Sequence, residues 1–356
     1  MPAARAPDVL LVSLGSTQGL RYADEELAAA LRRLGVSVTV ACARPPGELP
    51  SMMLTDLAWA RAARAAATSA LDEHQDEPPR SVIYSSTTAA LLWPRVGAIR
   101  FDATAAGNRP GRHGLWQRPL ERRRLAQATM LLPWSAGALH EAPSSARRGE
   151  RALVLPVPVE AGAVAATGAA PPARDIAALT YAANPRKKGL DRVLAAWRAL
   201  RAERGERGEE LVVAGASAQS LQRAGMLSAG ERGIRVAGWL AADDYHALLA
   251  RTRVFVCAPR REDYGIAQLE ALAHGCQLVT TPAPGPYAAL AIARALDARL
   301  IGDSLVGALR CALEDPAPGY NARALAALAP FTRAGVDRVL AGELLPRLHA
   351  QPAQLR

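Results

Sequence analysis

The chain has 356 residues, of which 50% are hydrophobic and 21% are charged, a balance that argues against disorder and a length that favours two domains. The 28 glycines and 26 prolines follow no three-residue period, which excludes a collagen-like structure. Lys and Arg number 43 against 33 Asp and Glu, so the formal net charge of +10 predicts an anionic partner, whether nucleic acid, acidic lipid or a phosphorylated small molecule.

The first half of the chain alternates short apolar runs with helical patterns, which is typical of βαβ units around a parallel sheet. The apolar runs predict strands over residues 8–13, 37–43, 81–85, 98–102, 129–133 and 153–159. A helix is predicted over residues 23–34 and a basic helix over residues 118–128. In the first turn, Gly15 and Gly19 are four apart, which does not fit the Gly-x-Gly-x-x-Gly pattern of dinucleotide-binding folds.

The same rhythm begins again after residues 160–174, whose Ala, Gly and Pro predict a linker. Strands are predicted over residues 178–182, 210–214, 234–237, 253–259 and 276–281, and helices over residues 189–202 and 243–251. An amphipathic helix is predicted near the C-terminus, where apolar side chains recur at steps of three and four: Val336, Val339, Leu340, Leu344 and Leu348. We therefore predict two doubly wound α/β domains, with a ligand beyond the carboxyl ends of the strands in the cleft between them.

The four cysteines, Cys42, Cys257, Cys276 and Cys311, lack the spacing of a zinc site or a disulfide framework, so we expect reduced core residues. The N-terminus has no long apolar region before a cleavage site, and no later stretch reaches eighteen uninterrupted apolar residues. The sequence therefore predicts a soluble, cytoplasmic protein.

Residues 253–275 carry the most informative pattern, in which an apolar strand runs into a loop with arginines and acids and Gly265 then opens a helix. Glu262 precedes this helix, and Glu270 lies about one turn inside it. Backbone N–H groups at the start of the helix attract an anion, and a diphosphate can approach Gly265 closely because it has no Cβ. The two acids can then accept hydrogen bonds from sugar hydroxyls. The alternative is that both glutamates are solvated ends of an ordinary helix.

This pattern, Glu262-Asp-Tyr-Gly265-x-x-x-x-Glu270-Ala271 after Pro259, resembles the Glu-x7-Glu signature of retaining glycosyltransferases of group 1 (family 4-like). Further similarity lies in the basic loop that ends in Lys188-Gly189 and in the later strand–loop elements, and it is clear over about residues 175–290. The resemblance implies the GT-B architecture, with two Rossmann-like doubly wound domains facing a cleft. It implies an acceptor-binding domain over residues 1–165, a nucleotide-sugar donor domain over residues 175–330, and a C-terminal helix over residues 331–356 that packs back on the N-terminal domain.

The resemblance also implies roles for single residues. Glu262 would bind hydroxyls of the donor sugar, and Glu270 the ribose of the nucleotide. The diphosphate would be held by Lys188 and by main-chain groups near Gly265 and Ile266. The nucleobase would lie against Gly238, Trp239 and Leu240, and the loop at Gly15 would lie near the donor phosphate and the acceptor.

Two positions depart from the family pattern. Arg186 follows the stretch in which relatives carry an arginine, so it is predicted to replace that residue; the alternative is a solvated basic turn. Asp102 stands where many relatives carry a histidine after the fourth strand, and the alternative is that it caps the next turn. His113 is a nearby histidine in a loop, with a structural or solvated role as its alternative.

The predicted activity is transfer of a sugar from a nucleoside diphosphate sugar, with UDP or GDP most expected, to an acceptor hydroxyl by a front-face mechanism that retains configuration. No Asp-x-Asp cluster is present, so neither a metal nor a tightly bound cofactor is implied. The predicted acceptor is a small molecule, a glycan or a lipid-linked sugar, and the basic charge suits peripheral association with an anionic membrane. Nucleic acid is not expected as a partner, because the chain has only three Phe and seven Tyr for base stacking. The alternative activity is that of a nucleotide-sugar epimerase of the same fold.

Overall fold

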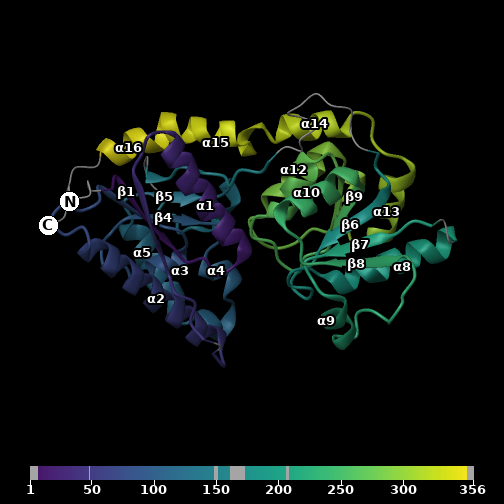
Figure 1. The fold of residues 1–356 in the computed structure, drawn as a ribbon, viewed down its shortest axis with the longest axis horizontal. Coiled ribbons are helices and arrows are strands. Elements are labelled where there is room, and N and C mark those ends of the chain that lie inside the picture. The colour runs from purple at the N-terminus through teal and green to yellow at the C-terminus, as the bar shows by residue number, and fades with distance from the viewer. Residues whose placement is uncertain (1–6, 48, 148–150, 161–172, 206–207, 351–356) are drawn as a thin grey trace. The chain divides into compact units, whose positions relative to one another are not determined.

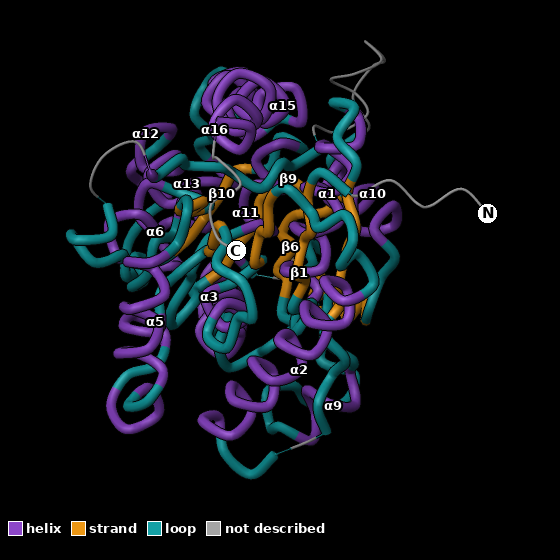
Figure 2. The backbone as a smooth tube through the Cα atoms, turned by 90° about the vertical axis from the view of Figure 1, so that its left-hand side faces the viewer, coloured by secondary structure: helices purple, strands orange, loops and turns teal. Residues whose placement is uncertain are grey.

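The computed structural model describes residues 7–47, 49–147, 151–160, 173–205 and 208–350. The chain divides into two compact units, one of Met1–Pro158 with Arg333–Arg356 and the other of Val159–Thr332. In each unit, helices surround a parallel sheet of five strands (Figure 1 and Figure 2). Most of the predicted linker, residues 161–172, lies outside the described residues. The doubly wound α/β prediction is confirmed for both sheets.

The first unit has the strand order β2-β1-β3-β4-β5. Its strands are β1 (Val9–Ser13), β2 (Val38–Cys42), β3 (Ser81–Tyr84), β4 (Ala98–Phe101) and β5 (Leu131–Pro133). Every residue of β1, β3, β4 and β5 is buried, because helices cover both faces of a parallel sheet. The helices of this part of the chain are α1 (Gln18–Arg33), α2 (Met52–Asp72), α3 (Thr87–Ala90), α4 (Ala105–Asn108), a 3₁₀ helix (Gly111–Gly114), α5 (Gln117–Gln127) and α6 (Ala136–Glu141).

The C-terminal segment belongs to the same unit and consists of α15 (Arg333–Val339), a π-helical turn (Leu340–Leu344) and α16 (Leu345–Ala350). Its apolar stripe is buried in one hydrophobic cluster with residues of β1 and α1: Val336, Leu340, Leu344 and Leu348. Two ion pairs with α1 flank this stripe, Arg33 with Asp337 at 2.9 Å and Arg333 with Glu26 at 2.7 Å. The four-residue spacing of the stripe therefore places all four side chains on the face that packs on the first sheet.

The second unit has the strand order β10-β9-β6-β7-β8. Its strands are β6 (Ile176–Tyr181), β7 (Leu211–Ala214), β8 (Ile234–Gly238), β9 (Thr252–Cys257) and β10 (Gln277–Thr280). The order reverses between β6 and β9, which pair in parallel although two strands separate them in sequence. In an open α/β sheet, ligands bind at such a switch point, beyond the carboxyl ends of the strands. The loops that follow β6 and β9 are therefore the place to look for a site.

The helices of the second unit are α8 (Leu190–Arg204), α9 (Ala218–Arg223), α10 (Ala242–Arg251), α11 (Ile266–Ala273), α12 (Ala288–Leu296), α13 (Leu305–Glu314) and α14 (Tyr320–Ala327), with 3₁₀ turns at Ala298–Leu300 and Ala329–Phe331. Gly265 immediately precedes α11 and Gly275 follows it, as the sequence predicts. Across the described residues, no helix is long and apolar enough to cross a lipid bilayer.

Two expectations about local structure are wrong. Residues 153–159 are not a strand: Ala152 makes a single bridge with Leu131, and the segment adds only two further hydrogen bonds to β5. Pro156 and Pro158 have no N–H to donate, so the ladder cannot continue. Cys42 is exposed rather than part of the core. It is the last residue of β2, at the edge of the sheet, where one side has no neighbouring strand.

Candidate functional site

The turn Lys188-Gly189, between β6 and α8, lies directly against the end of β9. Gly189 has a φ of 64°, and a Cβ at this position would lie 1.8 Å from the carbonyl oxygen of Ala258. Only glycine permits so close an approach of the two main chains. Because Gly189 has no side chain, the turn can lie against Ala258, and Lys188 is therefore next to the loop that follows β9.

Lys188 and Glu262, which are 74 residues apart in sequence, form a hydrogen-bonded ion pair at this point. The ammonium group donates to Oε2 of Glu262 at 2.6 Å, and Nε2 of Gln268 donates to the same oxygen at 3.1 Å. The side chain of Glu262 is only 7% exposed, and that of Lys188 is 23% exposed. The alternative of a solvated Glu262 is wrong, because the carboxylate is buried and paired.

The start of α11 lies beside this pair. Gly265 adopts a left-handed conformation with φ 94° and ψ 49°, and a Cβ there would lie 2.9 Å from the ring of Tyr287. The N–H groups of Ile266 and Ala267 fall in the first turn, where an α-helix offers them no carbonyl acceptor. The helix thus presents N–H donors and the positive end of its dipole next to Lys188 and Glu262.

Glu270 lies in the second turn of α11, and its side chain is 14% exposed, so it is not solvated either. Its Oε1 is 3.6 Å from Nε2 of His246, which extends from α10. The direct contact with the Glu270 carboxylate, together with its negative charge, raises the pKa of His246. Both acids of the motif therefore have a basic partner within the second unit.

Three more ion pairs brace the loops after β6 and β9. The carboxylate of Asp263 pairs with Nζ of Lys187 at 3.2 Å and with Nε of Arg261 at 2.7 Å. Arg260 holds both carboxylate oxygens of Asp191, at 2.9 and 2.7 Å, and these bonds keep the pKa of Asp191 below its usual value. Because Asp263 pairs with two basic groups and Arg260 reaches from the loop after β9 to Asp191 of α8, these pairs fix the two loops relative to each other.

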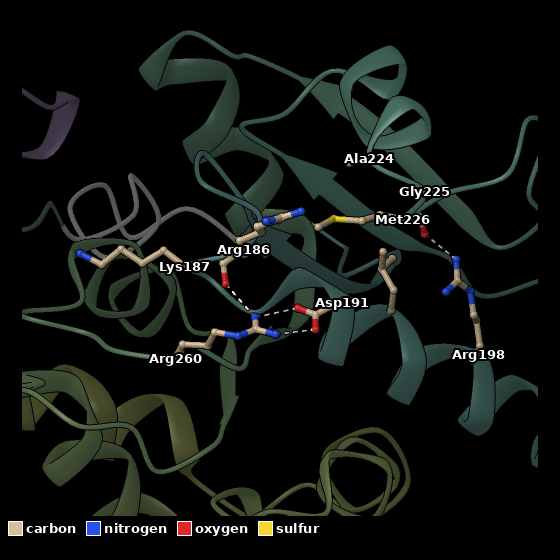
Figure 3. A pocket seen from close by; sticks show the side chains of 9 residues that line it. Arg186, Lys187, Asp191, Arg198, Ala224, Gly225, Met226 and Arg260 are labelled. Atoms are coloured by element: carbon tan, nitrogen blue, oxygen red, sulfur yellow. Dashed lines mark hydrogen bonds and ion pairs between the residues drawn. The ribbon is translucent and has the colours of Figure 1, made fainter. Parts of the chain in front are cut away.

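Arg186 lies apart from the Lys188–Glu262 contact. It lines an open pocket of about 650 Å³ together with residues of α8 and with Met226. Figure 3 shows its side chain directed toward Met226, while that of Lys187 extends the opposite way. The main-chain carbonyl of Arg186 accepts a hydrogen bond from Arg260 at 2.8 Å. The structure thus joins Lys188, rather than Arg186, to Glu262.

The end of β8 presents an aromatic surface. Gly238 has a φ of 76°, and its carbonyl accepts the N–H of Gly215 at 2.7 Å. Trp239, which follows, is 63% exposed, and Leu240 is half-buried. An exposed indole at the carboxyl end of a strand is a surface on which a flat ring can stack.

The predicted residues of the first unit lie after β1 and β4. Gly15 has a φ of 57°, and its carbonyl accepts a hydrogen bond from Arg21 at 2.8 Å. Asp102 accepts the N–H of Ala103 at 2.9 Å, which is the local capping interaction expected of it as an alternative. His113 is exposed in the 3₁₀ helix.

Two contributors to the site escape sequence reasoning. Gln268 is buried, and its bond to Glu262 has one signal in sequence, a polar residue within the otherwise apolar stretch Ile266–Leu269. His246 lies on another helix, and no spacing connects it to Glu270. Within the described residues, no group of three or more His, Cys, Asp and Glu side chains is arranged to hold a metal ion.

Residues 175–314 match the family model described as "Glycosyl transferases group 1". No curated protein matches the chain significantly. Among solved structures, Anabaena HepE in complex with UDP and glucose is 13% identical over 95% of this chain and 99% of its own, with a TM-score of 0.63. WaaG, a glycosyltransferase involved in lipopolysaccharide biosynthesis, is 14% identical over 94% and 99%, with a TM-score of 0.65.

An E. coli trehalose-6-phosphate structure with bound UDP-2-fluoro glucose is 12% identical over 99% of this chain and 100% of its own, with a TM-score of 0.65. These likenesses establish the fold, and the family match covers the part of the chain that contains the Lys188–Glu262 contact, α11 and Trp239. The chain therefore has the GT-B fold and carries, over residues 175–314, a glycosyltransferase domain of group 1.

Proposed function

We propose that this protein is a hexosyltransferase that moves a sugar from a nucleoside diphosphate sugar to an acceptor hydroxyl with retention of configuration. The observation that carries the proposal is the 2.6 Å contact of Lys188 with Glu262 beside the first turn of α11, inside the family match. A UDP sugar is the first donor to test and a GDP sugar the second. Support for UDP comes from the UDP-bound HepE and the trehalose-6-phosphate structure.

The donor diphosphate lies at the N-terminus of α11, against the amides of Gly265 and Ile266. Lys188 turns from Glu262 to the phosphate oxygens when the donor binds. Cleavage of the sugar–phosphate bond builds negative charge on the leaving diphosphate. Lys188, already at the phosphate once the donor is bound, and the helix N-terminus stabilise that charge with no further movement during the reaction. Glu262, released from Lys188 but still held by Gln268, accepts hydrogen bonds from hydroxyls of the sugar.

The nucleoside lies further along the same sheet edge. Glu270 accepts hydrogen bonds from the ribose, and the nucleobase stacks on Trp239 between Gly238 and Leu240. Arg186, which lies apart from the Lys188–Glu262 contact, adds positive charge to the site at longer range. Each of these groups lies in a loop or helix that follows a strand at its carboxyl end, which supports one continuous donor site.

The reaction proceeds on one face of the sugar. The bond between the anomeric carbon and the phosphate oxygen breaks, the acceptor oxygen bonds to the same face, and the acceptor proton passes to the departing phosphate oxygen. The leaving group itself serves as the base, so no carboxylate pair of the glycosidase kind is required. We propose that the reaction needs neither a metal nor a resident cofactor, that the loop at Gly15 lies near the donor phosphate and the acceptor, and that Asp102 lies within reach of the donor sugar. A small molecule, a glycan or a lipid-linked sugar fits that role, the last at an anionic membrane surface.

Two measurements test this function. A thermal-shift panel of UDP, GDP, ADP and TDP sugars identifies the donor, because a ligand that binds the native state raises its melting temperature. Analysis of the products with donor alone then separates two activities. Slow hydrolysis or an unchanged donor agrees with a transferase, whereas an epimerised donor, or no stabilisation by any sugar nucleotide, contradicts the proposal.

A further inference from the structure

Two histidines from neighbouring helices surround Glu270. His246 of α10 brings Nε2 to within 3.6 Å of Oε1 of Glu270. The ring of His246 stacks on that of His274, with centroids 4.9 Å apart and an angle of 29° between the planes. His274 follows directly after α11, so both ends of the stack rest on helices that are fixed to the second sheet.

The two imidazoles are not equivalent. Nδ1 of His274 lies 2.8 Å from the carbonyl oxygen of Glu270, and a carbonyl only accepts, so this nitrogen carries the proton. His274 is buried, its main-chain carbonyl accepts a hydrogen bond from Arg174, and burial lowers its pKa. His274 is therefore a neutral ring at pH 7 that fixes the plane of His246.

The surroundings of His246 favour its charged form. Glu270 faces it from α11, Asp243 lies in its own helix, and Glu160 adds a third negative charge from the segment before β6. His274, Tyr245 beside it and Tyr181 of β6 are neutral at pH 7; the ring of Tyr181 is tilted by 57° against that of Tyr245 and lies near Glu270. Arg174, which donates to the main-chain carbonyl of His274, is positively charged and helps to keep His274 neutral. The side chain of His246 is 23% exposed, so solvent protons reach it.

We infer that His246 is a positioning residue that orients the nucleotide-binding carboxylate of Glu270 and, when protonated, strengthens the binding of an anionic nucleotide sugar. This inference rests on the proposed function. An imidazolium held at Oε1 leaves the other carboxylate oxygen to accept from ribose hydroxyls. Its charge also offsets the repulsion between Glu270 and the diphosphate of the donor.

The direction of the pH dependence follows from the raised pKa. The imidazolium contribution is fully present below the usual pKa of histidine, near 6.5, and it is lost as the pH rises through the higher pKa of the folded protein. We expect nucleotide-sugar affinity to fall about fivefold between pH 6 and pH 8.5. Bound donor raises the same pKa further, so binding near neutral pH takes up protons.

The experiment measures Kd by calorimetry for UDP-glucose and GDP-glucose at pH 6.0, 7.0 and 8.5. Both probes are diphosphate diesters whose charge is constant over this range, unlike free UDP or GDP. The full-length protein is compared with His246→Gln and with His140→Gln, an exposed histidine of α6 in the first unit as the matched control. Repeating the pH 7.0 titration in two buffers of different ionisation enthalpy counts the protons taken up.

The expected result is a sloping Kd profile in the wild type and in His140→Gln, and a flat profile in His246→Gln at the high-pH affinity of the wild type. Equal slopes in all three proteins, or no proton uptake by the wild type, overturn the inference. If either of these results is found and Glu270→Gln nevertheless binds UDP-glucose or GDP-glucose more weakly than the wild type, the inference about His246 fails but the proposed function stands. Absence of binding of both probes at every pH overturns the inference, and the panel of UDP, GDP, ADP and TDP sugars then decides the proposed function separately.

Discussion

The two units differ in where their charged side chains lie relative to the loops at the carboxyl ends of the strands. In the second unit, the charged pairs lie within the loops themselves, as with Lys188 and Glu262, where a ligand can exchange with them. The first unit has a pair of similar exposure, Arg109 with Asp56 at 2.7 Å, but it also holds internal charges: Arg100 is buried against Asp24 at 3.8 Å, and Glu121 is buried and bonded to the start of α4. A carboxylate at a loop surface can change partners, whereas a buried one fixes the backbone around it. This difference agrees with a donor site in the second unit and with a supporting role for the buried acids of the first.

The buried acids of the first unit, Glu121 and Asp24, show how a buried carboxylate fixes the backbone around it. Both oxygens of Glu121 accept the N–H of Ala105, at 2.9 and 3.0 Å, so the carboxylate occupies the start of α4. Asp24 accepts the hydroxyl of Ser13 at 2.5 Å. Burial raises the pKa of Asp24 to about 6 and that of Glu121 to about 7. These carboxyls therefore titrate near physiological pH.

The largest effect on stability is expected from Gly189→Ala. This variant tests whether the loops of the second unit depend on the close approach of Gly189 to the carbonyl of Ala258. The new Cβ meets the carbonyl of Ala258 and requires a left-handed backbone, so we expect a loss of about 3 kcal/mol of unfolding free energy. The matched control is Gly319→Ala, which has the same left-handed conformation (φ 67°, ψ 15°) and whose Cβ would meet only the side chain of Arg323 at 3.6 Å, so about 1 kcal/mol is expected. Urea unfolding measures both, and equal losses would show that the contact with Ala258 is unimportant.

Glu262→Ala is expected to lower turnover about a hundredfold or more while the protein stays folded, because the sugar loses a charged acceptor. Activity with the donor found in the nucleotide panel measures the effect, and circular dichroism checks the fold. Glu343→Ala, an exposed acid paired with Arg347, serves as the control and keeps normal turnover. Near-normal turnover in Glu262→Ala contradicts the assignment of this residue.

Lys188→Met is expected to slow turnover about ten- to a hundredfold, since one charge-assisted hydrogen bond to the leaving phosphate contributes about 1.5–3 kcal/mol. Lys187→Met is the neighbouring control: Lys187 is 48% exposed and pairs with Asp263, so only a small change is expected. If both variants slow the reaction equally, the charge of the loop matters rather than the contact with Glu262.

The smallest effect concerns the first unit. A carboxyl whose pKa is raised by folding destabilises the folded state as the pH rises from the unfolded pKa to the folded one. For Glu121 this window runs from about 4.5 to about 7. We expect Glu121→Gln to gain about 1 kcal/mol over the wild type at pH 8 and nothing at pH 4.5. Melting temperatures at the two pH values measure this, with Glu343→Gln as control, and an equal change at both pH values would exclude titration as the cause.

The strands were predictable because their apolar runs are bounded by turn residues, and only 153–159 failed, where prolines interrupt the ladder. The 21-residue helix α2 was not predicted. Its buried face consists mainly of alanines, Ala60, Ala63, Ala67 and Ala70, which differ too little from their neighbours to mark a stripe. A helix can be predicted from its sequence only when the side chains of its buried face are clearly more apolar than those of its exposed face, however long the helix is.

For the site, the motif identified Glu262, Gly265 and Glu270, but not their partners. The pairing of Glu262 with Lys188 depends on two loops that meet through the strand order, and that of Glu270 with His246 on the packing of α10 against the second sheet. Neither relation has a fixed spacing in sequence. The position of these residues at the end of a strand and the start of a helix could be predicted, and the contacts created by the fold could not.

The pairing of β6 with β9 has a consequence for how the protein folds. Lys188 and Glu262 can meet only after a long segment of chain, containing β7 and β8, has closed into a loop. Contacts between residues so distant in sequence carry a large entropic cost and form slowly. A nascent chain that ends before β9 therefore contains Lys188 but not Glu262, so the ion pair between the two loops can form only after synthesis has passed the loop that follows β9.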